Sequence, residues 1–470
     1  MLSYIIEKVI IGEMKLMTKT MKNELTKDMT TGNPIKLILL FSIPLLIGNI
    51  FQQFYSMVDT IIVGRFVGVD ALAAVGSTGS MGFLINGFVI GLTSGFAVLI
   101  SQKFGAKNEE GLKKATASAL VLSLVSTIII TIISVMFAKP LLHLMNTPDN
   151  IINDANKYIT IIYGGTIATV AYNILASILR ALGDSKTPLY FLIIASILNI
   201  ILDIVFIVNF NMGVSGAAYA TIISQGVSSI LCLIYTYKKY KILRLKMEDF
   251  KVKKRVYIKH LKIGIPMALQ FSITAIGIMT VQGALNIFGS TVIAAYTAAS
   301  KVLQIVMQPA ITFGVTMATY CGQNLGAKNY GRIKEGVKKC TEISIITSII
   351  AGLILVFGGK FFVGLFISNP DASILAYAQE CLNYSAIFFI PLGLIFIYRN
   401  ALQGMGESFV PMMAGAYELI ARAIVAFTLP RFIDYTGICL ADPIAWLAAA
   451  IPLGLYYFKK MRTIEKKKLV

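Results

Sequence analysis

The chain has 470 residues, with 42 Lys and Arg against 23 Asp and Glu, which gives a net charge of +19. Hydrophobic residues make up 56% of it and charged residues only 14%, and the mean hydropathy is +0.76. Because a soluble domain carries about 25% charged residues, this composition leaves too little polar surface to cover a water-soluble globule. It excludes an ordinary soluble protein and predicts an integral membrane protein.

Long apolar runs follow one another along the chain. Each reaches or exceeds the roughly 20 residues with which a helix crosses the hydrocarbon core of a bilayer. The runs are continuous, whereas a membrane β-barrel would show segments of about ten residues in strict alternation. We therefore predict an all-α integral membrane protein with twelve transmembrane helices. In chain order, the predicted spans lie near residues 37–63, 73–101, 115–138, 156–180, 188–208, 214–237, 263–288, 292–321, 340–367, 375–402, 411–430 and 438–458.

Positive charges fall mostly in alternate loops. Twelve spans place both termini and every even-numbered loop on one side of the membrane, and most Lys and Arg lie there. The positive-inside rule makes that side cytoplasmic. We expect residues 238–262 to form a basic cytoplasmic linker and 459–470 a cytoplasmic tail of a multi-pass cell (plasma) membrane protein. The charge thus indicates topology and contact with membrane lipids, and no nucleic-acid partner is expected.

Residues 1–36 are predicted to be a cytoplasmic N-terminal leader. Charged residues, among them Glu7 and Lys8, interrupt any apolar core long enough for a signal peptide. The start of translation is left open between the first residue and three later methionines: Met14, Met17 and Met21.

No sequence pattern indicates an enzyme or a structural metal site. The five cysteines are scattered without a CxxC pair. There is no Ser/His/Asp or HExxH grouping and no ATP-binding P-loop pattern. We therefore expect no catalytic residue, no cofactor and no direct use of ATP.

The two halves of the chain resemble each other. The segment 102–108 (QKFGAKN) matches 323–329 (QNLGAKN), and 182–185 (LGDS) matches 405–408 (MGES). The offsets are all about 222 residues, and several matches in order at one spacing indicate an internal repeat.

The repeat predicts two pseudo-symmetric lobes of six spans each, over residues 37–237 and 263–458. Six is an even number, so both lobes insert in the same orientation as parallel repeats. Parallel repeats are typical of transporters, in which the substrate binds near the middle of the membrane and rocking of the lobes gives alternating access.

Polar residues deep in a span are costly and indicate function. The first predicted helix carries Asp59, preceded on the same face by Gln52 and Tyr55 at helical spacing. The fifth carries Asn199 and Asp203, again on one face. The first lobe further offers an amide and a hydroxyl in the fourth and sixth spans: Asn173 and Thr221.

Two carboxylates in a low-dielectric site cannot both ionise cheaply. The pair would therefore take up a proton or bind a monovalent cation, and its charge would change on loading. Moving one charge through the membrane potential is worth about 2.3 kcal/mol per 100 mV. This property suits a site that couples an ion gradient to a conformational change.

Structural alternatives remain for these residues. Asp59 would alternatively be a hydrated carboxylate at the membrane interface, at the outer end of its helix. Asp203 would alternatively cap a helix or form an ion pair near the outer loop 209–213. Asn173 would form an interhelical hydrogen bond, and Thr221 would bond back to its own helix.

The second lobe carries different charges. Val281 and Gln282 stand where the repeat places the counterpart of the first-helix acid. Glu418 and Arg422, at i and i+4, are predicted to neutralise each other as a structural pair. Lys301 has no evident partner, and it either projects into a central cavity or snorkels.

Five segments carry a resemblance to a known family: Ile43-Pro44, Val58–Arg65, Arg180–Pro188, Leu198–Asp203 and Gly213–Ala218. They resemble the corresponding segments of the multidrug and toxic compound extrusion (MATE) family, and the resemblance covers essentially the whole chain after the leader. The DinF-like prokaryotic branch fits better than the NorM type, which also uses an acid in the seventh helix, where this chain has Gln282.

The resemblance implies a twelve-helix exporter that expels cationic or amphipathic drugs in exchange for H+ or Na+. We expect it to act as a monomer. Gln52, Tyr55 and Gln282 are candidates for touching the substrate. The ion-linked network of DinF-like members corresponds here to Asp59, Asn173, Asn199, Asp203 and Thr221.

The alternative is a lipid-linked oligosaccharide flippase of the same superfamily. Such a substrate is large and anionic, so its cavity would need several Arg or Lys. The predicted spans offer mainly Lys301 and Arg422, which favours drug export.

Overall fold

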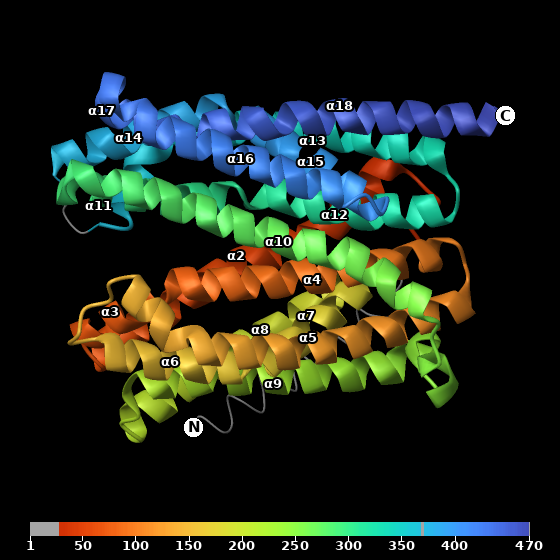
Figure 1. The fold of residues 1–470 in the computed structure, drawn as a ribbon, viewed down its shortest axis with the longest axis horizontal. Coiled ribbons are helices and arrows are strands. Elements are labelled where there is room, and N and C mark those ends of the chain that lie inside the picture. The colour runs from red at the N-terminus through yellow and green to blue at the C-terminus, as the bar shows by residue number, and fades with distance from the viewer. Residues whose placement is uncertain (1–27, 368–370, 470) are drawn as a thin grey trace.

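The structure is a computed structural model that describes residues 28–367 and 371–469. These residues form helices joined by short turns (Figure 1). In chain order the helices are α2 (Pro34–Phe66), α3 (Val69–Ser77), α4 (Gly79–Gly105), α5 (Glu109–Leu144), α6 (Ile152–Gly164), α7 (Thr166–Ala181), α8 (Lys186–Asp203), η1 (Ile204–Asn209), α9 (Gly213–Lys239), η2 (Lys241–Leu243), η3 (Met247–Phe250), α10 (Lys254–Leu285), η4 (Asn286–Phe288), α11 (Ser290–Val306), α12 (Gln308–Gly326), α13 (Tyr330–Gly364), α14 (Ala372–Ile387), α15 (Phe389–Gly404), α16 (Phe409–Thr428), α17 (Pro430–Cys439) and α18 (Ala441–Leu469).

Within the described residues, nine helices are long and apolar enough to cross a membrane, and the number rises to twelve if each bent pair is one span. The bent pairs are α6–α7, α11–α12 and α14–α15, with bends of 46°, 41° and 53°. The predicted all-α membrane fold with twelve spans is therefore confirmed. The sequence analysis placed a single apolar run at each of these three positions and did not locate the breaks.

The helix ends follow from local sequence. Asn33 and Asn108 cap α2 and α5 by accepting hydrogen bonds from the backbone N–H groups of Lys36 (3.3 Å) and Gly111 (2.7 Å), which lack a partner within the helix. In the repeated LGDS and MGES motifs, Gly183 and Gly406 follow α7 and α15 with φ of 84° and 87°. Glycine adopts this left-handed conformation without steric cost, so the motif ends the corresponding helix in each half.

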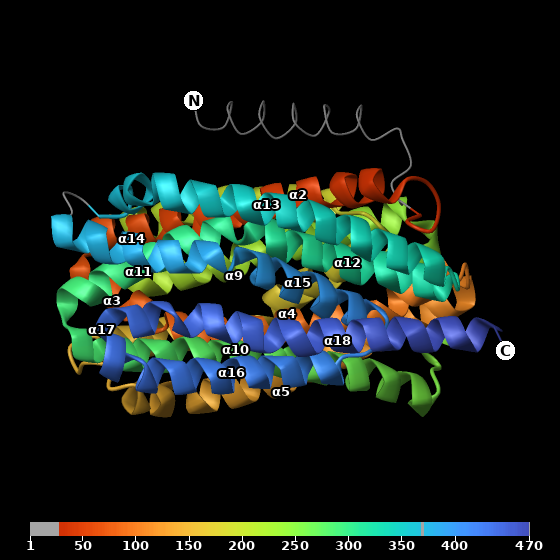
Figure 2. The same cartoon turned by 90° about the horizontal axis from the view of Figure 1, so that it is seen from above.

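The helices form two bundles, α2–α9 and α10–α18, that lie side by side with their helices roughly along the long axis of Figure 1. Helix α10 packs along α4, and α12 packs against α2 and α4. Turning the molecule, as in Figure 2, shows α2 beside α13, so the first helix of one bundle also contacts the other. These helices form the interface between the halves.

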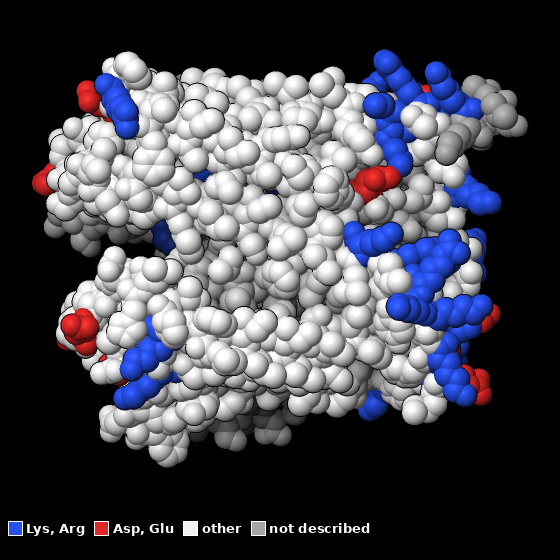
Figure 3. Space-filling view, viewed as in Figure 1, with Lys and Arg blue, Asp and Glu red and all other residues white. Residues whose placement is uncertain are grey.

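The two ends of the molecule differ in charge and shape. Lys and Arg gather at the end where α4 meets α5 and where the chain reaches the C-terminal part of α18 (Figure 3). At the opposite end the surface is hollowed between the two bundles (Figure 3). We call these the basic end and the hollow end.

Helices run further than the sequence analysis expected at three places. α2 starts at Pro34, inside the predicted leader 1–36, of which residues 1–27 lie outside the described part. α9 and α10 extend into the predicted linker 238–262, and the chain between them contains only short 3-10 turns. α18 continues through residue 469, across the predicted tail 459–470.

Candidate functional site

Two carboxyl groups of the first half lie together. Asp59 projects from α2 and is partly buried, while Asp203 is the last residue of α8 and is fully buried. The two carboxyls, which we call the acid pair, lie within hydrogen-bonding reach of each other. Directly after Asp203 the chain forms the π-helical turn η1, and such irregular turns recur at functional sites.

Three residues that the sequence singled out surround Asp203. With the Asn199 amide oriented to satisfy its neighbours, its nitrogen donates to Asp203 Oδ2 (3.1 Å) and its oxygen accepts from the backbone N–H of Thr221 (3.2 Å). The Thr221 hydroxyl also lies 3.4 Å from that amide and contacts the side chain of Tyr55. The structure therefore brings together residues from α2, α8 and α9.

Tyr158 on α6 belongs to the same cluster and was missed by the sequence analysis. It lies close to Asp59, Tyr55 and Asp203 and packs against a cluster of apolar residues from α2, α3, η1 and α9. The sequence around it carries no motif that points to the acids. Only the tertiary arrangement of the helices reveals that it lies beside the acids.

Other predicted site residues lie apart from the acid pair or have local partners. The Asn173 amide donates to the carbonyl of Thr169 one turn earlier on α7 (2.9 Å). Gln282, near the end of α10, is exposed and donates to Asn286 (3.2 Å), and Gln52 is exposed on α2. Their roles in coupling or substrate binding stay predictions.

The acid pair has unused hydrogen-bonding capacity. On Asp59 and on Asp203 the Oδ1 oxygen is buried, and it has no hydrogen-bond partner among the described residues. A buried oxygen without a partner is costly, and two ionised carboxylates in contact also repel each other. A proton shared between the carboxyls, or a monovalent cation held by their oxygens, would relieve both costs. No group of three or more His, Cys, Asp or Glu suited to a metal occurs in the described part of the chain.

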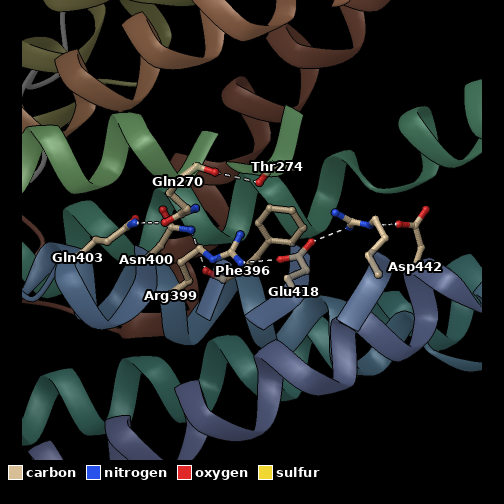
Figure 4. Close-up of polar contacts among 9 residues, drawn as sticks. Gln270, Thr274, Phe396, Arg399, Asn400, Gln403, Glu418 and Asp442 are labelled. Carbon is tan, nitrogen blue, oxygen red and sulfur yellow. Dashed lines mark hydrogen bonds and ion pairs between the residues drawn. The ribbon is translucent and has the colours of Figure 1, made fainter. Parts of the chain in front are cut away.

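The second half holds four charged residues in a different arrangement, the charge network, of which three are buried and the fourth, Asp442, is partly exposed (Figure 4). Glu418 on α16 accepts from Arg399 of α15 (3.0 Å) and from Arg422 of its own helix (2.8 Å). Arg422 also pairs with Asp442 of α18 at 2.6 Å. The predicted Glu418–Arg422 pair is thus confirmed, and its two further members come from other spans.

The charge network is balanced and enclosed by neighbouring helices. Its two cations and two anions alternate, and Tyr296 of α11 lies 3.5 Å from the second carboxylate oxygen of Asp442. An ideal Cβ on Gly277 of α10 would lie only 2.2 Å from Arg422 Nη1, so glycine makes room for the guanidinium. Lys301 takes no part: its side chain is exposed on α11, and no ion pair joins it to another described residue.

The helical fold, its two similar halves and the buried charges are those of a membrane transporter. A family model, MatE, matches the chain twice, over residues 44–205 and 263–428. The two matches together cover more than half of the chain, and they fall one in each half. The chain belongs to the MatE family and is a multi-pass membrane protein.

Known proteins of this family resemble the chain over most of its length. "Probable multidrug resistance protein YpnP" of Bacillus subtilis (strain 168) is 30% identical over 449 residues, which are 94% of this chain and 99% of that protein. "Probable multidrug resistance protein YoeA" of the same organism is 29% identical and covers 89% and 92%. The crystal structure of MATE in the bent conformation superposes with a TM-score of 0.88 at 23% identity, covering 95% of this chain and 100% of that one. This last likeness concerns the fold.

Proposed function

We propose that the protein is a secondary active multidrug efflux antiporter that exports cationic or amphipathic small molecules in exchange for H+ or Na+. The observation that carries the proposal is the acid pair, Asp59 and Asp203, whose charge changes when an ion binds between the carboxyls. The names of the relatives supply the substrate class. Coupling of ion binding to transport through the first half is what the resemblance to the DinF-like branch implies. The proposal involves no cofactor and no enzymatic step.

The distribution of charge gives the proposed orientation. We place the basic end at the cytoplasmic face of the cell membrane, in line with the positive-inside rule. Both termini then lie in the cytoplasm, and the hollow end opens to the outside. In this orientation an external ion reaches the acid pair through the hollow end, while the basic end is closed.

The transport cycle follows from the geometry of the first half. An ion enters from outside and binds between Asp59 and Asp203, which neutralises the pair. The first half repacks around Tyr55, and its affinity for the bound drug falls, so the drug leaves to the outside. The halves rock, the ion leaves inward, and a new drug enters from the cytoplasm. Gln52, Tyr55 and Gln282 are the proposed substrate contacts.

Proteoliposomes test this proposal. A fluorescent cationic dye is loaded, and a pH gradient and then a Na+ gradient are imposed. The wild type exports the dye under one of the two gradients, whereas Asp59→Asn and Asp203→Asn lose gradient-driven export. Asp70→Asn is the matched control, because Asp70 is an exposed acid in the first turn of α3. Export by both Asn variants at the wild-type rate and equal expression would refute coupling at the acid pair.

A lipid-linked oligosaccharide flippase has less support. Its anionic substrate would need cationic side chains free to bind it. The buried Arg399 and Arg422 are both engaged by carboxylates, so they offer no such site. Uptake of a labelled lipid-linked sugar into vesicles separates the two functions.

A further inference from the structure

The repeated segments 102–108 and 323–329 have no part in the proposed function so far. They end α4 and α12 at the basic end, and each ends in the same turn. Lys107 and Lys328 have φ of 53° and 59°. The following asparagine N–H bonds back to the carbonyl five residues earlier, at 3.1 Å in the first copy and 2.8 Å in the second. The repeat therefore gives the two halves one local structure.

The two copies meet each other across the interface. An ideal Cβ on Gly105 would lie 1.9 Å from the carbonyl oxygen of Gln323, and one on Gly326 would lie 1.8 Å from that of Gln102. Each glycine thus packs on the glutamine of the other copy. Such reciprocal contacts are those of a two-fold interface. Side chains larger than hydrogen do not fit at this separation, as in close helix pairs within membranes.

Each glutamine also holds the opposite half by its side chain. The Gln102 amide donates to the carbonyl of Gly404 at the end of α15 (3.0 Å), and the Gln323 amide donates to that of Ala181 at the end of α7 (2.9 Å). Carbonyls in the last turn of a helix lack partners within the helix, so each glutamine satisfies one of them. The hydrogen bonds follow the same two-fold relation as the glycine contacts.

The segment before α2 adds further hydrogen bonds to the second copy of the repeat. The backbone N–H of Met29 donates to Gln323 Oε1 (2.8 Å). Its carbonyl accepts from Asn324 (3.1 Å) and from Arg332 (3.3 Å). The Met29 side chain is fully buried. The segment before α2 therefore holds the second copy of the repeat in place.

We propose that these two segments form a latch that closes the basic end and opens once in each transport cycle. The inference rests on the proposed function for its place in that cycle. Contacts that exist only in the closed state set the equilibrium between the closed and open conformations. Weakening the latch should therefore populate a conformation that is open at the basic end, without drug or gradient.

Spin labels on Lys107→Cys and Lys328→Cys measure the separation of the two segments, since both positions are exposed. The five native cysteines, all buried, are replaced by alanine. The distance distribution of this labelled full-length protein in nanodiscs is compared with that of the same protein carrying Gly326→Ala. The added Cβ would meet the Gln102 carbonyl. Gly331→Ala is the control, because a Cβ there meets nothing within 4 Å.

A second variant, Gln323→Ala, removes the amide donor without adding bulk, and it carries the test if Gly326→Ala does not fold. We expect a new population at longer distances in either variant and the wild-type distribution in Gly331→Ala. Wild-type distributions in both Gly326→Ala and Gln323→Ala would overturn the latch. Because the distances are measured without drug or ion gradient, this result is independent of whether the protein exports drugs.

Discussion

Each half of the molecule holds one buried and one partly buried carboxyl group, but the two halves neutralise them differently. In the second half, Glu418 and Asp442 face arginines at 2.6–3.0 Å. In the first half, Asp59 and Asp203 face each other, and no Lys or Arg pairs with them among the described residues. A fixed cation makes a carboxylate part of the scaffold, whereas its absence leaves the site open to a mobile ion. The two halves thus share a similar fold but differ in how their carboxyl groups are neutralised.

The energetic consequences of the two arrangements are opposite. Removing one member of a buried ion pair leaves an uncompensated charge and is strongly destabilising. Replacing one of two contacting carboxyls by an amide removes a repulsion. The charge network should therefore respond to substitution mainly in stability, and the acid pair mainly in transport.

The largest expected effect is that of Glu418→Ala. It leaves Arg399 and Arg422 buried with a single remaining carboxylate, and we expect a loss of about 3–5 kcal/mol in the free energy of unfolding. Denaturation in mixed micelles measures it. Glu342→Ala, which breaks the exposed pair with Lys339, should cost less than about 1 kcal/mol. Equal small losses for both variants would show that the charge network is not a structural unit.

Gly277→Ala should have an intermediate effect. The added Cβ would lie 2.2 Å from Arg422 Nη1, so the guanidinium or α10 must shift, which typically costs about 1–3 kcal/mol. The control on the same helix is Gly283→Ala, where a Cβ meets nothing within 4 Å. The same micelle assay compares the two. If Gly277→Ala were as stable as Gly283→Ala, the close approach of α10 to the network would be irrelevant to stability.

The smallest effect on stability is expected for Asp203→Asn. The amide keeps the shape of the carboxyl and removes its repulsion with Asp59, so the free energy of unfolding should rise or change by less than about 1 kcal/mol. Gradient-driven dye export should nevertheless be lost. A loss of stability comparable to that of Glu418→Ala would mean that the acid pair is a structural element like the charge network.

The sequence was sufficient for features that depend on local order. Hydropathy located the twelve spans, and i, i+4 spacing predicted the Glu418–Arg422 pair that the structure contains. It did not reveal Arg399, Asp442 or Tyr158 as partners, because each lies on a different helix and only packing brings it into contact.

The contact between the two repeated segments was equally hidden. The sequence showed that 102–108 and 323–329 are alike, but similarity between two segments does not imply that they touch. Their contact depends on a backbone approach that only the arrangement of the halves defines. The breaks within three spans were missed for a related reason, since hydropathy is continuous across Gly165, Met307 and Phe388.

The central claim is that the acid pair exchanges ions and the charge network does not. The most direct test counts the ions released when a cationic drug binds to the purified protein without a gradient. A pH indicator reports H+, and radioactive Na+ reports sodium. The wild type should release H+ or Na+ as the drug binds, because the acid pair changes its charge state. Asp203→Asn should release none, while Asp442→Asn, which alters the charge network, should release as many as the wild type. Release that persists in Asp203→Asn but disappears in Asp442→Asn would contradict the account.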